Sequence, residues 1–249
     1  MAMNNAAFSG PPPNPTFGVD LGEQMLRDGV EVPRLLEKCA EAIELHGLDN
    51  MGIYRLSGTT SKVQRLKQKL DYDLEGTDLL SEENLSDIND SAAVLKLWFR
   101  EMPEPLLTWE LYYGFIEAAS TLHFGSVHLC SFAAHSLITP FPWRVVEIEN
   151  NRLRHIRLHE RVNDLPDPNY ATLRFLMGHL HKIRERESIN QMGCANLAIV
   201  FGPNLLGAPP PGYPVPAGVA NGGGSALADM PWQTKCIETI LEHYVEIFV

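Results

Sequence analysis

Basic residues are scarce in this sequence of 249 residues. Lys and Arg total 20 against 31 Asp and Glu, which leaves a formal net charge of −11. Nucleic acids and anionic membranes carry negative charge themselves, so an acidic chain is a poor partner for either. We therefore expect no nucleic-acid partner, and the few basic residues become informative by where they cluster.

Cysteine is also scarce, and its four positions are widely spaced without a CxxC pair: Cys39, Cys130, Cys194 and Cys236. This pattern excludes a disulfide framework and a Cys/His metal array, and it is typical of core thiols in an intracellular protein. The G-x-x-x-x-G-K-[ST] loop of nucleotide-binding proteins and the G-x-S-x-G elbow of hydrolases are absent too. The sequence thus predicts a chain with no metal, no cofactor and no nucleophile of its own.

Targeting signals and transmembrane segments are lacking as well. Residues 1–16 are rich in proline, without the basic and apolar regions of a secretory signal, and they read as a flexible linker. Residues 118–143 contain no charged side chain, but three histidines, four serines and two prolines argue against a spanning helix. We predict a cytoplasmic protein, with any recruitment to the cell cortex or other membrane contact made by regions outside this chain.

Runs of alternating β-branched residues are absent, whereas helical periodicity is common. Apolar residues recur at helical spacing in residues 32–47, 59–70, 86–102, 108–119, 167–186 and 234–248. The short apolar run 194–202 fits either a strand or a buried helix. The predicted fold class is all-α, a single helical domain over residues 17–249.

Two segments interrupt this pattern. An uncharged insertion lies near residues 118–146, and a loop rich in Pro and Gly lies near residues 207–229. Three interpretations of the insertion stay open: a contact with a membrane or protein, a cover packed on the helices, or translated intronic sequence from a faulty gene model.

The stretch "GIYRLSG", residues 52–58, places a single arginine on an apolar loop between Gly52 and Gly58. The glycines allow the chain to turn, and the apolar neighbours of Arg55 anchor the loop on both sides. Because arginine is costly to bury unpaired, Arg55 either pairs with a nearby carboxylate or is held outward for a function.

A second stretch, "LKLWFREMPEPLLT", combines an amphipathic helix with a basic pair. Lys96 and Arg100 are four residues apart and fall on the helix side opposite the apolar residues, and Pro103 and Pro105 end the helix. The pair is either a solvated face or a small basic patch for an acidic partner.

A third stretch, "NLAIVFGPNLL", begins with a carboxamide and holds Gly202, Pro203 and Asn204. Asn196 is either a helix N-cap or a rigidly held recognition group, and Asn204 is expected to form a turn.

These three stretches, in this order and at this spacing, resemble the signature blocks of Rho GTPase-activating (RhoGAP) domains. The resemblance runs from about Phe17 to the C-terminus, and the Pro/Gly loop and chain ending are most similar to fungal members that carry an F-BAR region. It implies a helical bundle that stimulates GTP hydrolysis by a Rho, Rac or Cdc42-type small GTPase in its GTP-bound state. GTP and Mg²⁺ would be held by that partner. The alternative is a GTPase-binding or scaffold module of the same fold without catalytic effect.

The resemblance also implies roles for single residues. Arg55 matches the arginine finger that is inserted in trans into the GTPase active site. Lys96 matches a residue that meets the acidic switch surface, and Arg100 one that buttresses the finger or extends that patch. Asn196 matches an asparagine that contacts the GTPase close to the nucleotide. The remaining motif positions are expected to be structural: Gly52, Gly58, Pro103, Pro105, Gly202, Pro203 and Asn204.

Overall fold

The computed structural model describes residues 11–120, 143–214 and 226–249. Every regular element in these ranges is a helix, which confirms the all-α prediction. The helices are α1 (Leu21–Asp28), α2 (Arg34–His46), α3 (Thr60–Tyr72), the 3₁₀ helix η1 (Asn84–Ser86), α4 (Ile88–Glu101), α5 (Tyr112–Ala119), α6 (Trp143–Asn163), α7 (Asp167–Arg184), α8 (Glu187–Asn190), α9 (Cys194–Leu205), α10 (Ala226–Glu242) and α11 (Tyr244–Phe248).

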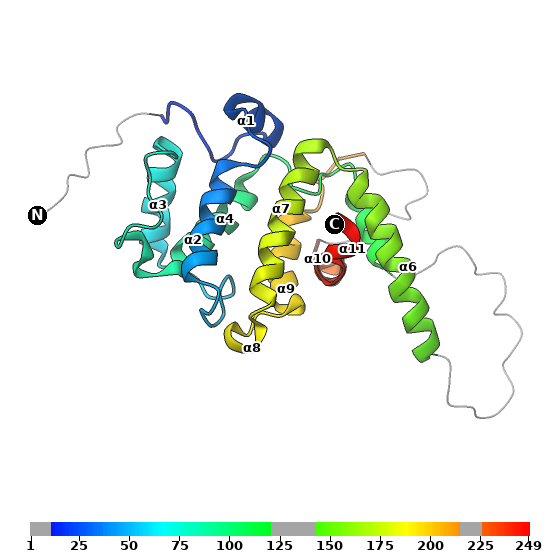
Figure 1. Ribbon diagram of the computed structural model, residues 1–249. Coiled ribbons are helices and arrows are strands. Elements are labelled where there is room, and N and C mark those ends of the chain that lie inside the picture. Colours follow the sequence, from blue (N-terminus) through cyan, green and yellow to red (C-terminus); the bar gives the residue numbers. More distant parts are fainter. Residues whose placement is uncertain (1–10, 121–142, 215–225) are drawn as a thin grey trace, which may run out of the picture.

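The helices form a bundle around one continuous apolar core. Helices α2 and α7 lie side by side, with α4 behind α2 and α9 behind α7 (Figure 1). Helix α9 packs closely on α10, and α6 packs on α5 and α10. The loop between α2 and α3 lies at one end of the bundle, beside α8 (Figure 1).

Helix α4 runs through the middle of the bundle, as its sequence pattern predicts. The Asp87 side chain accepts a hydrogen bond from the Asn89 amide and so caps the helix start. The apolar stripe Val94, Leu95, Trp98 and Phe99 is buried. The helix ends at Glu101, just before the two prolines that cannot continue it.

The ambiguous run 194–202 is helical and belongs to α9. At Gly202 an added Cβ would lie 3.0 Å from backbone atoms of Gln233 and Thr234, so the absence of a side chain lets α9 and α10 approach closely. Asn204 lies inside this helix and donates to the Val200 carbonyl, so the prediction of a turn there is wrong. Pro203 is accommodated in the last turn of the same helix.

Several boundaries differ from the predictions. Helices α1, α6 and α8 were not predicted from periodicity, and the chain ends in two helices separated at His243 rather than one. Helix α7 is preceded by Pro166 at the N-cap position, and Asp167 lies in its first turn.

The predicted linker is too long, because Thr16 belongs to the packed domain. Its amide donates to the Asp71 carboxylate at 2.7 Å, and its carbonyl accepts from the Trp98 indole at 3.0 Å. At the other end, α10 begins at Ala226, so the predicted Pro/Gly loop extends too far. Residues 1–10 and 215–225 lie outside the described residues.

Most of the predicted insertion, residues 121–142, also lies outside the described residues. Its first two residues, Ala118 and Ala119, are buried in α5, and its last four form the start of α6. The buried Arg154 side chain on α6 donates to the Ala119 carbonyl at 3.0 Å, so the helices on either side of the segment are held together directly. Among the described helices, none combines the length and hydropathy needed to span a bilayer.

Candidate functional site

The α2–α3 loop, residues 47–59, folds back on itself at a tight turn. Gly52 has φ +73° and Tyr54 has φ +68°. The amides of Arg55 and Leu56 both donate to the Gly52 carbonyl at 2.9 Å. Glycine adopts this backbone region readily, but for tyrosine it is strained by about 1–3 kcal/mol, so other contacts must hold Tyr54 in place.

Burial of the Tyr54 side chain supplies the first of these contacts. The ring is completely buried and packs edge-on against Phe201 with centroids 4.9 Å apart. Its hydroxyl lies 2.8 Å from His179 Nε2 on α7. The buried ring of Tyr54, whose hydroxyl is hydrogen-bonded to His179, thus anchors the turn to the core.

The His179 imidazole is itself held by a carboxylate at its other nitrogen. His179 Nδ1 lies 2.9 Å from Glu44 Oε1, and Lys182 donates to the other Glu44 oxygen at 2.7 Å. The ionised carboxylate only accepts, so Nδ1 carries the proton and the neutral ring accepts from the Tyr54 hydroxyl at Nε2. Burial lowers the pKa of His179 despite the hydrogen bond to Glu44, which favours this neutral form.

The Glu44 carboxyl group is stabilised in its charged form. Burial alone would raise its pKa, but hydrogen bonds from His179 and Lys182 outweigh this effect, and the pKa is lowered. The chain Tyr54–His179–Glu44–Lys182 therefore links the α2–α3 loop to the surface between α2 and α7.

The backbone of the α2–α3 loop is also fixed from both sides. The Gly52 amide donates to the Asn190 carbonyl at 2.8 Å, and the ammonium of Lys96 on α4 donates to the Tyr54 carbonyl. Asn190 is fully buried, and its amide group donates to the Leu48 carbonyl at 2.8 Å. The turn is thus bonded to α4 on one side and to the end of α8 on the other.

Gly58 secures the exit of this loop. A Cβ there would lie 2.8 Å from Asp90 Cα on α4, so only glycine permits this approach without a shift of the backbone. The neighbouring Thr59 amide donates to the Asp90 carboxylate at 2.8 Å.

Arg55 projects outward from the anchored turn. Its side chain is exposed, and its guanidinium makes no hydrogen bond or ion pair with the residues that the structure describes. Arg55 Nη2 lies 3.6 Å from the position that a Gly52 Cβ would occupy, so the guanidinium lies over the glycine. The interpretation of Arg55 as one half of a structural ion pair thus finds no support in the described part of the chain.

The basic pair on α4 divides into two different environments. Lys96 is half-buried against the Tyr54 carbonyl, and burial, together with the nearby Arg100, lowers its pKa. Arg100 is exposed. A solvated face therefore does not describe Lys96. The contact with the arginine loop, one of the two roles expected of Arg100, is made by Lys96.

Asn196 lies in the first turn of α9, where Gly193 holds the N-cap position, so the N-cap interpretation is wrong. Its side-chain amide donates to the Gln191 carbonyl at 2.9 Å. Gln191 directly follows Asn190, whose carbonyl binds the Gly52 amide. Asn196 is thereby tied to the segment that holds the α2–α3 loop.

Sequence reasoning missed three supporting residues of the site: Glu44, His179 and Asn190. A signal existed only for His179, a polar residue inside the apolar stripe Leu176, Leu180 and Ile183 of α7. Nothing in the sequence links Glu44 or Asn190 to the turn. Glu44 acts through His179, from which it is separated by 135 residues, and Asn190 bonds Leu48 across 142 residues.

Comparison with known proteins settles the family. A model of the RhoGAP domain matches residues 33–210. The chain belongs to the RhoGAP domain family. It is 39% identical to Rho GTPase-activating protein 31 of Mus musculus, over 93% of the chain and 14% of that protein. It is 35% identical to Rho GTPase-activating protein 32 of Xenopus laevis, over 93% of the chain and 10% of that protein.

Solved structures agree with this family. Human Rho GTPase activating protein 15 shares 29% identity at a TM-score of 0.75, with full coverage of both chains. The BH domain of GRAF, the GTPase regulator associated with focal adhesion kinase, shares 27% identity at a TM-score of 0.62, over 93% of the chain and 96% of that domain. The finer resemblance to fungal F-BAR proteins is not supported, since these relatives are animal proteins. This chain spans only 10% and 14% of the length of these two curated relatives.

Replacement of Tyr54 by Phe tests the anchor. The variant removes the hydroxyl and leaves His179 Nε2 buried without its partner, so we expect the free energy of unfolding to fall by about 1–3 kcal/mol. Urea denaturation measures this change. Tyr113→Phe on α5, at a partly exposed side chain, is the control and should change stability by less than about 0.5 kcal/mol. Equal stability of the Tyr54 variant and the wild type would contradict the anchor.

The neutral state of His179 predicts a pH dependence of stability. Because its pKa is lowered on folding from 6.5, the unfolded chain binds a proton that the folded chain does not, and stability is lost as the pH falls below about 6.5. We expect His179→Gln to flatten the slope of unfolding free energy between pH 7.5 and about pH 5. The exposed His46→Gln on α2 is the control. His155, whose pKa is also lowered, contributes equally to all three proteins, so an unchanged slope in His179→Gln would contradict the assignment.

Proposed function

We propose that this RhoGAP domain accelerates GTP hydrolysis by a small GTPase of the Rho family, with Arg55 supplied in trans. The observation that carries the proposal is an exposed guanidinium that has no partner among the described residues, on a turn whose backbone is bonded on both sides. Membership of the RhoGAP family supports it, as does similarity to proteins named Rho GTPase-activating proteins.

The chemistry of phosphoryl transfer explains why such an arginine is useful. In the transition state negative charge spreads over the γ-phosphoryl oxygens and the bridging oxygen. A planar guanidinium is permanently charged and offers several donors at fixed angles, which suits that distribution. A turn that is already fixed need not be ordered at the moment of reaction, so more of the interaction energy stabilises the transition state. GTP and Mg²⁺ belong to the partner in its GTP-bound state.

The residues around Arg55 have different roles in this proposal. Lys96 acts through the loop, since its ammonium binds the Tyr54 carbonyl and fixes the direction in which Arg55 leaves the turn. Arg100 is exposed one helical turn further along α4 and offers its charge to an acidic partner surface. Asn196 retains free hydrogen-bonding capacity at its carbonyl oxygen, because only its amide nitrogen is engaged, and we assign it a contact with the GTPase.

Replacement of Arg55 by Ala tests the proposal directly. We expect the stimulated hydrolysis rate to fall by about 10³–10⁵-fold, while the affinity for the GTP-bound GTPase is largely kept. Arg55→Lys should not restore the rate, because an ammonium lacks the planar fork. Single-turnover hydrolysis with a panel of GTP-loaded Rho-type GTPases measures the rate, and Arg174→Ala, at an exposed arginine on α7, is the matched control.

Two outcomes would contradict this function. Wild-type rates in the Arg55→Ala variant would remove Arg55 from the reaction. Tight binding of a GTPase by the wild-type domain, without any stimulation of hydrolysis, would favour the non-catalytic binding module instead.

Lys96 and Arg100 should differ in the step that they affect. Lys96→Met keeps the aliphatic stem but removes the donor to the Tyr54 carbonyl, so we expect the maximal stimulated rate to fall by about 10–100-fold through misplacement of Arg55. Arg100→Ala should leave that maximal rate unchanged and weaken binding about two- to five-fold, with a smaller salt dependence of association. Titration of the domain into single-turnover reactions separates the two parameters. A pure affinity loss in Lys96→Met would contradict its role as a positioning residue.

A further inference from the structure

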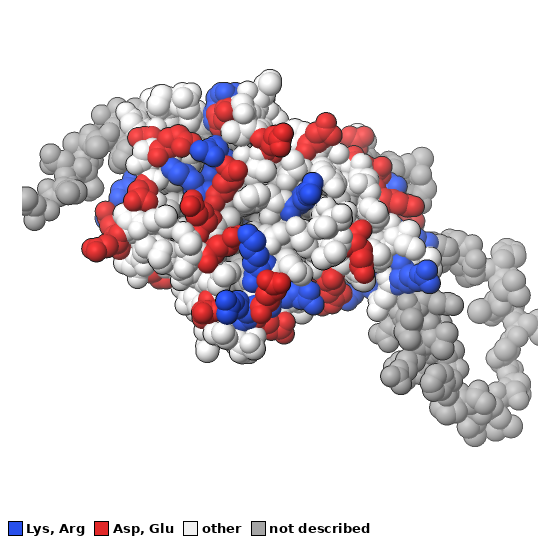
Figure 2. All heavy atoms as spheres, viewed as in Figure 1, with Lys and Arg blue, Asp and Glu red and all other residues white. Residues whose placement is uncertain are grey.

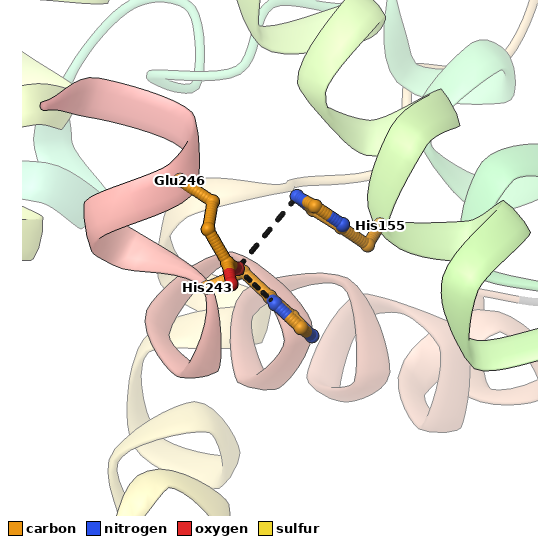
Figure 3. Close-up of side chains that lie close together, drawn as sticks. All are labelled: His155, His243 and Glu246. Carbon is orange, nitrogen blue, oxygen red and sulfur yellow. Dashed lines mark hydrogen bonds and ion pairs between the residues drawn. The ribbon is translucent and has the colours of Figure 1, made fainter. Parts of the chain in front are cut away.

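Two segments of the chain bring imidazole and carboxylate groups together on the side of the molecule formed by α6 and α11. His155 comes from α6, His243 lies between α10 and α11, and Glu246 lies on α11 (Figure 3). One ligand atom of each residue lies within 4.8 Å of those of the other two. The cluster is remote from the α2–α3 loop, which lies at the α8 end of the bundle (Figure 1). It therefore has no part in the function proposed above.

The His155 side chain has an unused nitrogen that faces this cluster. His155 Nε2 is buried and has no hydrogen-bond partner among the described residues. It lies 3.8 Å from the nearer Glu246 oxygen, too far for a hydrogen bond, and the same oxygen contacts His243 Nδ1. The two imidazole rings are stacked, with centroids 4.3 Å apart. A buried polar atom without a partner calls for an occupant that the side chains alone do not supply.

We propose that His155, His243 and Glu246 bind a zinc ion that joins α6 to the C-terminal helices. Two imidazole nitrogens and one carboxylate oxygen form a ligand set suited to Zn²⁺, with water in the fourth position. At metal–ligand distances of about 2.0–2.1 Å, tetrahedral ligands lie about 3.3 Å apart. The separation of 3.8 Å between His155 and Glu246 is close to this value. Because the stacked rings direct their lone pairs in parallel, binding also requires the half-exposed His243 ring to turn out of the stack, and the exposed Glu246 carboxylate is free to follow it.

The protonation states of the three groups suit a metal. Burial and the nearby His243 lower the pKa of His155, which leaves its ring neutral at pH 7 with a lone pair available. The hydrogen bond from His243 lowers the pKa of Glu246 and keeps the carboxylate ionised. With a cation bound, His243 and Glu246 would both coordinate the ion instead of bonding each other directly.

The expected consequence is a metal cross-link between parts of the chain that are distant in sequence. Zinc that binds only the folded state raises stability in proportion to ln(1 + [Zn²⁺]/Kd). Because α6 carries His155 and the last two helices carry the other ligands, the metal would hold α6 and the chain end together independently of any GTPase.

Titration of Zn²⁺ into the metal-free, untagged protein tests the site. We expect one equivalent to bind, measured by competition with a chromophoric chelator and by calorimetry, and the melting temperature to rise with zinc concentration. Loss of a residue outside the coordination sphere already costs about 10–100-fold in affinity, so His155→Ala and His243→Ala should each cost at least about 100-fold. Glu246→Ala, at an exposed position where folding is not at risk, should also weaken binding.

Matched variants separate this site from zinc bound elsewhere. His46→Ala, at an exposed histidine on α2, should keep wild-type affinity. The absence of saturable binding at micromolar zinc would overturn the proposal, and would leave a water molecule as the occupant beside His155. Equal affinity of the wild type and Glu246→Ala, or equal losses in His155→Ala and His46→Ala, would overturn it too. None of these results depends on stimulation of a GTPase.

Discussion

The hydrogen bond between the Tyr54 hydroxyl and His179 is the constraint on which the rest of the site depends. It holds the ring of a residue whose backbone is strained in the left-handed region, and so fixes the turn from which Arg55 projects. With the Tyr54 hydroxyl as donor, the bond uses the neutral ring of His179. Burial favours this neutral form, and the Glu44 carboxylate at Nδ1 fixes which nitrogen keeps the proton. A buried network of this kind is stabilising only when every member has its hydrogen bonds. Loss of one member would therefore release the turn and change the position of Arg55 at the surface.

The described surface carries charges of both signs, and two of its lysines are bonded within the domain itself. The domain is acidic overall, and Figure 2 shows basic and acidic side chains interspersed over the face formed by α2 and α7. Lys182 and Lys96 are bonded to Glu44 and to the Tyr54 carbonyl, respectively. Arg55 and Arg100, in contrast, are exposed, and in the proposed function both are offered to an acidic GTPase surface.

The sequence predicts the parts of this domain that depend on local order. Amphipathic spacing identifies α2, α3, α4 and α7, and the two glycines and apolar anchors around Arg55 predict an arginine on a loop, either paired with a carboxylate or held outward. The sequence predicts a chain without a metal, and the proposed zinc site departs from that prediction. His155 is followed by His159 one turn later, and His243 by Glu246, but each pair alone is unremarkable in a helical sequence, and only the packing of α6 against the chain end joins them.

Long-range contacts account for the other differences. Lys96 is half-buried because it contacts the Tyr54 carbonyl on another segment. Helical periodicity along α4 gives no information about such a contact. Asn196 differs for a local reason, because its partner Gln191, five residues earlier, has a left-handed backbone with φ +61° that helical periodicity does not predict. Helix α6 packs on α5 and α10, and one of its own buried side chains is Arg154, which donates to the Ala119 carbonyl, so its apolar stripe is weak.

A crystal structure of this domain bound to a Rho-type GTPase with GDP and aluminium fluoride would test preorganisation of the α2–α3 loop most directly. The account predicts that the backbone of residues 50–59 shifts by less than about 1 Å relative to the free domain, with the bonds from Lys96 and Asn190 kept, and that the Arg55 side chain alone swings to the fluoride. A turn that refolds on binding, with Tyr54 released from His179, would contradict it.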